Sequence, residues 1–98
     1  MDKKEKKTFT SDSLNGLTDA VMDSIGQTSD VQVGKLIKYT ETQKGVSVKC
    51  INTEEKTQVY FNAYPNEDGW FTGLPQSSGI KDVEKSTKDY TPISELDV

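Results

Sequence analysis

The chain has 98 residues, which is enough for one domain and too few for two. Only 32% of its residues are hydrophobic and its formal net charge is −4, so part of the chain is expected to stay outside a packed core. All 12 basic residues are lysines, and the absence of histidine and arginine argues against the usual general base, the commonest metal ligand and bidentate contacts to phosphate.

Residues 1–10 form a charged stretch with no apolar run behind it. This is not the pattern of a signal peptide, and no segment of the chain approaches the length of a transmembrane helix. We therefore expect a flexible charged tail over residues 1–10, a cytoplasmic protein and no membrane association.

Apolar residues recur at helical spacing after this tail. They are Leu14, Leu17, Val21 and Ile25. Serines before this stripe are suited to cap the start of a helix, and Gly26 is suited to end it. The pattern predicts a short amphipathic helix over residues 11–26, whose apolar stripe packs on the protein's own sheet or on a partner.

The middle of the chain alternates between apolar and polar side chains, which is the period of a β-strand. Strands at residues 31–40, 46–52 and 57–64, separated by short polar turns, predict an antiparallel meander. Gly34 suggests a bulge or a sharp bend in the first strand. Cys50, the only cysteine, follows the apolar alternation of the second strand, so we interpret it as a small buried hydrophobe. A single cysteine excludes an intramolecular disulfide and fits a reducing compartment.

Residues 65–69 have the composition of a turn, and Trp70 and Phe71 follow as candidates to close one end of the core. Weakly apolar residues further along are expected to add one or two short strands. The layout predicts a β-rich α+β domain over residues 31–98, in which a small antiparallel meander closes into a bent sheet or a half-open barrel. OB-like and SH3-like barrels have this size, and the comparison is one of architecture.

The composition favours a non-catalytic protein-binding module: an adaptor, an assembly component or an inhibitor that occupies the surface of another protein. Rigid aromatic side chains give large contact areas at low entropic cost, so the candidate contact residues are Tyr60, Tyr64, Trp70 and Phe71. Residues 65–98 carry three lysines and seven acidic residues, and this acidic C-terminal third is a further candidate for contacting a partner. Without histidine or a Gly-rich phosphate loop, no enzyme activity, cofactor or metal is expected.

The alternative is a small β-barrel that binds single-stranded nucleic acid, since such proteins combine a basic groove with rings on which bases stack. Residues 31–64 carry five lysines and three acidic residues. The candidate face consists of Lys35, Lys38, Lys49, Lys56, Tyr39 and Tyr60. The net charge of −4 and the lack of arginine oppose this alternative, because phosphate contacts dominate the affinity of such proteins.

Overall fold

The computed structural model describes residues 8–38 and 40–96. The strands in this part of the chain are β1 (Phe9–Ser11), β2 (Val31–Lys38), β3 (Lys44–Asn52), β4 (Thr57–Asn66), β5 (Gly69–Thr72), β6 (Gln76–Gly79) and β7 (Thr91–Pro92). The helices are α1 (Leu14–Ile25), α2 (Val83–Ser86) and the short 3-10 helix η1 (Ile93–Glu95). None of the helices in the described ranges is long and apolar enough to cross a membrane.

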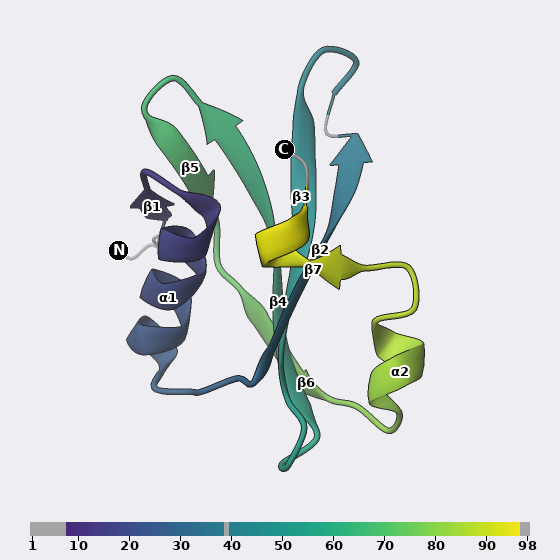
Figure 1. Cartoon of the computed structure of the whole chain (residues 1–98). Coiled ribbons are helices and arrows are strands. Elements are labelled where there is room, and N and C mark those ends of the chain that lie inside the picture. The colour runs from purple at the N-terminus through teal and green to yellow at the C-terminus, as the bar shows by residue number, and fades with distance from the viewer. Residues whose placement is uncertain (1–7, 39, 97–98) are drawn as a thin grey trace, which may run out of the picture.

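The strands form one antiparallel sheet with the order β1-β5-β4-β3-β2-β7 (Figure 1). β6 pairs with the first half of β4 and β5 with the second half, so β5 and β6 are two parts of one interrupted strand. β1 and β7 lie at opposite ends of this order, and the sheet is open. The expected β-rich α+β class is confirmed, whereas the OB-like or SH3-like barrel is not.

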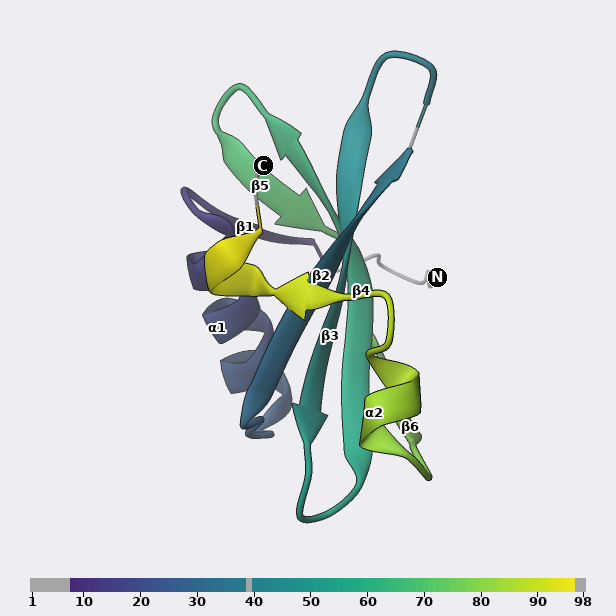
Figure 2. The same ribbon diagram turned by 45° about the vertical axis from the view of Figure 1, so that its right-hand side comes forward.

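Helix α1 covers one face of the sheet, which we call the helix face (Figure 2). The hydroxyl of Ser13 caps the start of the helix by accepting a hydrogen bond of 3.0 Å from the N–H of Gly16. The helix contributes four apolar residues to the main core: Leu14, Leu17, Val21 and Met22. The sheet contributes alternate residues of β3 and β4 to the same core: Val46, Val48, Cys50, Val59, Phe61 and Ala63. Removal of these side chains from water is the principal force that holds helix and sheet together.

Residues 80–92, which we call the strap, cross the opposite face of the sheet, which we call the open face. The strap contains α2 and ends in β7, which pairs with Val33 and Gly34 of β2. The chain then returns to the helix face, where Ile93 of η1 joins the main core. Figure 2 shows this path, with α1 and η1 on one side of the sheet and α2 on the other. The C-terminal segment therefore passes around the outer side of β2 at Val33 and Gly34.

Gly34 does not produce the bulge that its position suggests. β2 and β3 pair without interruption from Val31 and Ile51 to Lys38 and Lys44. A Cβ atom at Gly34 would lie 2.9 Å from Cδ2 of Leu96, so the glycine makes room for the C-terminal segment on β2. The prediction of a bulge is wrong, because a contact with a distant segment explains the glycine.

The N-terminal boundaries also differ from those predicted. Residues 1–7 of the predicted tail lie outside the described residues. Phe9–Ser11 forms β1, an edge strand that pairs with β5, although the predicted tail extends to residue 10. Helix α1 starts at Leu14, three residues after the start of the predicted range 11–26.

We expect Leu17→Ala to lower the free energy of unfolding by about 2–5 kcal/mol, because this fully buried side chain leaves a cavity between α1 and the sheet. Urea denaturation followed by the fluorescence of Trp70 measures the change. Asn15→Ala, at an exposed position of the same helix, is the matched control and should have little effect. A loss of less than about 1 kcal/mol for Leu17→Ala would show that α1 does not pack on the sheet.

Candidate functional site

A row of side chains crosses the open face at the end that lies beyond the strap. The strand register places Ile37 beside Gly45, and Phe71 between Tyr64 and Thr10. Gly45 and Tyr64 are also neighbours, since a Cβ atom at Gly45 would lie 2.7 Å from Cδ1 of Tyr64. The row therefore runs across the sheet from β2 to β1, while α2 lies over the other end of this face (Figure 2).

The ring of Tyr64 is held between its neighbours on both sides. It lies over the backbone of Gly45, and its centroid is 5.6 Å from that of the Phe71 ring, at an angle of 47° between the two planes. Glycine weakens a strand because it has no side chain to pack, and a ring that lies across it covers the bare backbone. Tyr64 and Phe71 thus form a packed aromatic pair, and both remain half-buried.

A bulge beside this pair opens a hollow in the open face. The pairings of β4 with β5 and β6 leave two residues of β4 opposite the three residues 73–75. Such an extra residue bends a strand, and Pro75 within the bulge has no N–H to donate to β4. The hollow has a volume of about 380 Å³. Its lining includes Tyr60, Asn62, Tyr64, Leu74 and Gln76.

Two apolar side chains at the hollow are well exposed: Leu74 at 61% and Tyr60 at 37%. The hydroxyl of Tyr60 donates a hydrogen bond of 3.4 Å to Oε1 of Gln76, which orients the ring along the rim. Single exposed apolar residues are ordinary on protein surfaces, but these two adjoin the aromatic pair. Together the four residues form a contiguous group, which we call the aromatic patch: Tyr60, Tyr64, Phe71 and Leu74.

The strap covers the other end of the open face through polar contacts with β3 and β4. Nζ of Lys49 donates to the carbonyl oxygen of Ser86 at 2.7 Å and lies 4.7 Å from the centroid of the Tyr90 ring. The hydroxyl of Ser86 donates to Oε1 of Gln58 at 3.0 Å, and the hydroxyls of Ser47 and Tyr90 are 3.1 Å apart. Hydrogen bonds and a cation–ring contact therefore hold the strap. They mark the boundary of the end that no described helix or strand crosses, which we call the uncovered end.

The structure brings together three of the four predicted contact residues. Tyr60, Tyr64 and Phe71 lie on the open face, whereas Trp70 packs against the main core on the helix face. Consecutive residues of a strand point to opposite faces, so Trp70 and Phe71 of β5 are separated by the sheet. Sequence reasoning misses Leu74, because strand alternation assigns no direction to a residue in an irregular Gly-Leu-Pro step.

The residues of the alternative nucleic-acid face do not form one surface. Lys49 is held by the strap. Lys56 lies in the turn between β3 and β4, at the opposite end of the sheet from Lys38 at the end of β2. Lys35 and Lys38 differ in parity along β2 and point to opposite faces. Tyr39 lies outside the described residues.

Within the described ranges, two titratable groups have shifted pKa values, and each shift has a structural cause. The pKa of Asp30 is lowered, because its carboxylate accepts hydrogen bonds from the hydroxyl and the backbone N–H of Thr53. Burial raises the pKa of Cys50 to about 12, with a further contribution from the negative charge of Asp19. Neither group belongs to the aromatic patch. Among the residues that the structure describes, no group of three or more acidic or cysteine side chains is arranged to hold a metal ion.

Comparison with known proteins gave no match: no family model, no curated protein and no solved structure matches this chain. Its function is therefore inferred from its own residues.

We expect Lys49→Met to loosen the strap while the main core stays folded. Methionine keeps most of the apolar stem but loses the charge and the hydrogen bond to Ser86, and a hydrogen bond of this kind contributes roughly 1.5–3 kcal/mol. The amides of residues 83–90 should then exchange with deuterium at least about tenfold faster, as measured by mass spectrometry. Lys56→Met, in the turn between β3 and β4, is the matched control. Unchanged exchange in the strap would contradict the role assigned to Lys49.

We expect Cys50 to resist iodoacetamide in the folded protein at about pH 8 and to react readily in urea. Its side chain is 1% exposed, and a pKa of about 12 leaves almost no thiolate at that pH. The mass of the alkylated protein, followed over time with and without urea, measures the reaction. Labelling of the folded protein as fast as that of the unfolded chain would mean that β3 is not buried as described.

Proposed function

We propose that this protein is a non-catalytic binding module that docks on another protein through the uncovered end of its open face. The observation that carries the proposal is the aromatic patch, in which Tyr60, Tyr64 and Leu74 line a hollow of about 380 Å³ and Phe71 packs on the ring of Tyr64. The strap covers the rest of this face and leaves the patch outside its polar contacts. Contiguous exposed apolar patches on small domains mark interaction sites.

The shape of the patch suits a protein surface better than a small molecule. Pockets for small ligands enclose most of the ligand's surface. The hollow beside Tyr60 is a depression that is open to solvent, and Leu74 at its rim is largely exposed. An apolar side chain of a partner that entered this depression would bury both residues at once. Rigid rings at such positions commonly contribute most of the binding energy of an interface.

The polar groups around the patch are suited to recognition. Asn62 and Gln76 present amide groups at the hollow, and the described residues of its lining include no carboxylate and no amine. General acid–base catalysis most often uses histidine, and the sequence contains none. The amides can instead exchange hydrogen bonds with a partner's backbone and so set its register.

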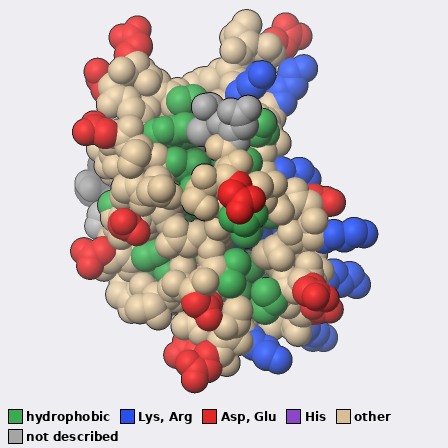
Figure 3. All heavy atoms as spheres, viewed as in Figure 1, with side chains coloured by type: hydrophobic (Ala, Val, Ile, Leu, Met, Phe, Trp, Pro, Cys, Tyr) green, Lys and Arg blue, Asp and Glu red, His purple; other side chains and the backbone are tan. Residues whose placement is uncertain are grey.

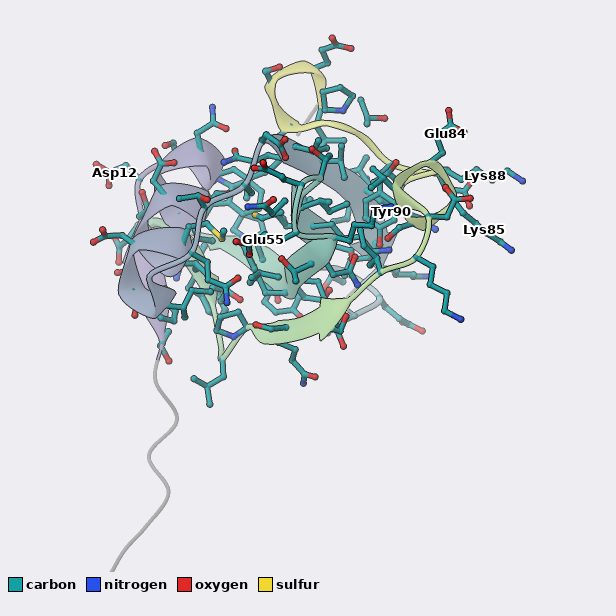
Figure 4. All side chains as sticks on the ribbon, turned by 90° about the horizontal axis from the view of Figure 1, so that it is seen from below. Asp12, Glu55, Glu84, Lys85, Lys88 and Tyr90 are labelled. Atoms are coloured by element: carbon teal, nitrogen blue, oxygen red, sulfur yellow. The ribbon has the colours of Figure 1, made fainter. Side chains whose placement is uncertain are left out.

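The described part of the acidic C-terminal third, residues 65–96, does not form a single acidic surface. Three lysines and three acidic residues are interleaved in the strap: Lys81, Asp82, Glu84, Lys85, Lys88 and Asp89. Figure 4 shows Glu84, Lys85 and Lys88 projecting outward from the same end of the molecule, so opposite charges are mixed there. Acidic side chains are also scattered over the face seen in Figure 3. We therefore assign docking to the aromatic patch and not to an acidic field.

A photo-crosslinking residue tests this proposal in cells of the source organism. p-Benzoylphenylalanine in place of Asn62, which is exposed at the hollow, should give one discrete adduct upon irradiation. The same residue in place of Ser24, which is exposed on α1, reports on the opposite side of the molecule and should give none. Equal yields of one adduct from both positions would contradict docking through the open face.

The double variant Tyr60→Ala/Leu74→Ser should bind the crosslinked protein at least about tenfold more weakly, as measured by isothermal titration calorimetry. Ile25→Ser is the matched control, because Ile25 on α1 is 37% exposed, as is Tyr60. Wild-type affinity in the double variant would overturn the proposal. Micromolar, salt-sensitive binding of a labelled oligothymidylate that is lost in Lys35→Glu would favour the nucleic-acid alternative instead.

A further inference from the structure

One half of the outer edge of β2 has no neighbouring strand among the described residues. β2 spans eight residues and pairs with β3 along its whole length. On its other side, β7 pairs only with Val33 and Gly34. Figure 1 shows the end of β2 standing clear of β7. Residues 35–38, which we call the β2 edge, therefore present alternate backbone N–H and C=O groups outward.

The β2 edge offers apolar side chains on both sides of the sheet. Leu36 pairs with Val46 and so points to the helix-face side, yet it is 49% exposed. Ile37 points to the open face, where it begins the row that leads to Tyr64. A hollow of about 310 Å³ lies against this edge and the adjoining turn, and its lining includes Leu36, Ile37, Lys38, Thr40 and Lys44. A strand laid along the edge would contact an apolar side chain on each face.

The charge around the edge is positive. Lys35 and Lys38 lie on the edge itself, and Lys44 lies across the turn. Glu41 is the one acidic residue in the sequence from 35 to 44. Three lysines and one glutamate give this segment a net charge of +2. Figure 3 shows lysine side chains at the upper right, where β2 and the turn after it lie, and further lysines down the same side towards α2. An acidic segment would be attracted to this edge, and a basic one would be repelled.

We propose that the β2 edge takes up an extended, acidic segment of the partner protein as an added strand. This proposal rests on the proposed function and adds a second contact to it. Ile37 of the edge lies in the same row across the sheet as Tyr64 and Phe71 of the aromatic patch. Backbone hydrogen bonds along residues 35–38 would supply affinity, and the lysines would select acidic side chains. In this arrangement one partner engages the patch with apolar side chains and the edge with a strand.

The same residues argue against a second copy of this chain as the occupant. Only four residues of the edge are available, since β7 occupies the next two. If the edges of two copies paired with each other, four lysines would lie close together, namely Lys35 and Lys38 of each copy. Like charges placed opposite one another destabilise a strand pair, and lysines on an exposed edge are a common device against self-association.

A fluorescein-labelled peptide of alternating glutamate and valine is the probe for this edge. Binding to the ¹⁵N-labelled full chain should shift the amide signals of residues 35–38 and slow the exchange of those that point outward. Lys35→Glu/Lys38→Glu should weaken binding at least about tenfold, as measured by fluorescence anisotropy. Lys85→Glu/Lys88→Glu, which makes the same change of charge on the strap, is the matched control and should bind nearly as well as wild type.

Three further probes test whether the acidic peptide binds as an added strand and whether the edge selects negative charge. The same peptide with alternate amides N-methylated cannot add as a strand, and a peptide of alternating lysine and valine has the wrong charge, so neither should bind. Equal binding of either peptide, or no binding of the acidic peptide at millimolar concentration, overturns the proposal. Equally tight binding of labelled oligothymidylate would replace it with a general anion surface.

Peptide binding and the photo-crosslink at Asn62 together distinguish strand addition at the β2 edge from docking through the aromatic patch. The acidic peptide should bind the variant Tyr60→Ala/Leu74→Ser as well as wild type, because that variant leaves the β2 edge intact. If the photo-crosslink at Asn62 forms but the acidic peptide does not bind, docking through the patch stands and strand addition is wrong. If the peptide binds and no crosslink forms, the edge is a site on its own and the patch is not the docking surface.

Discussion

The alternation of side chains along β3 is the constraint on which the rest of the structure depends. β3 lies at the centre of the sheet and pairs with β2 on one side and β4 on the other. Val46, Val48 and Cys50 point into the main core, and the residues between them point to the open face. A shift of the register by one residue would exchange the two sets and place the charge of Lys49 under α1. The hydrophobic burial beneath the helix therefore also determines which side chains reach the open face.

Those side chains divide the open face into a covered and an uncovered end. Lys49 and Ser47 offer polar groups that hold the strap. Gly45, at the start of the same strand, offers none, and the ring of Tyr64 lies across it instead. Hydrogen bonds hold the strap at the covered end, where Ile51 is also fully buried, whereas the uncovered end exposes the apolar side chains of Tyr60 and Leu74. Exposed apolar surface is unfavourable in the free protein, and burial of Tyr60 and Leu74 by a partner would recover roughly 25 cal/mol per Å².

The sequence predicts the local parts of this fold and not the contacts between distant parts. The three central strands follow from alternation between residues 31 and 64, because each strand is half-buried and its turns are polar. The bonds of Lys49 to Ser86 join residues 37 positions apart, and no local pattern reports such a contact. For the same reason the sequence suggests a free lysine on a basic face, where the structure has a half-buried one beneath the strap. Gly34 is a second case, since its explanation lies in Leu96.

The candidate site was predictable to the extent that it depends on alternation. Tyr60 and Tyr64 are four positions apart, each two positions from Asn62, so their common face follows from the sequence. Trp70 and Phe71 are adjacent, and which of the two joins the tyrosines depends on how β5 pairs with β4. A pairing shifted by one residue would have placed Trp70 beside Tyr64 and Phe71 over the main core. The bulge that exposes Leu74 is set by the pairing of β4 with two separate strands, which alternation cannot show.

In the proposed complex, the edge and the patch act as one surface whose parts have different physical roles. Ile37 at the edge and Tyr64 in the patch belong to a single row across the sheet, with Gly45 between them. The backbone groups of residues 35–38 would pair with an added strand whatever its side chains. The rigid apolar rings would supply contact area, and the lysines would favour a negatively charged segment. None of these roles needs an imidazole that titrates near neutral pH or a guanidinium that clamps a phosphate. A chain whose basic residues are all lysines is therefore sufficient for recognition of this kind.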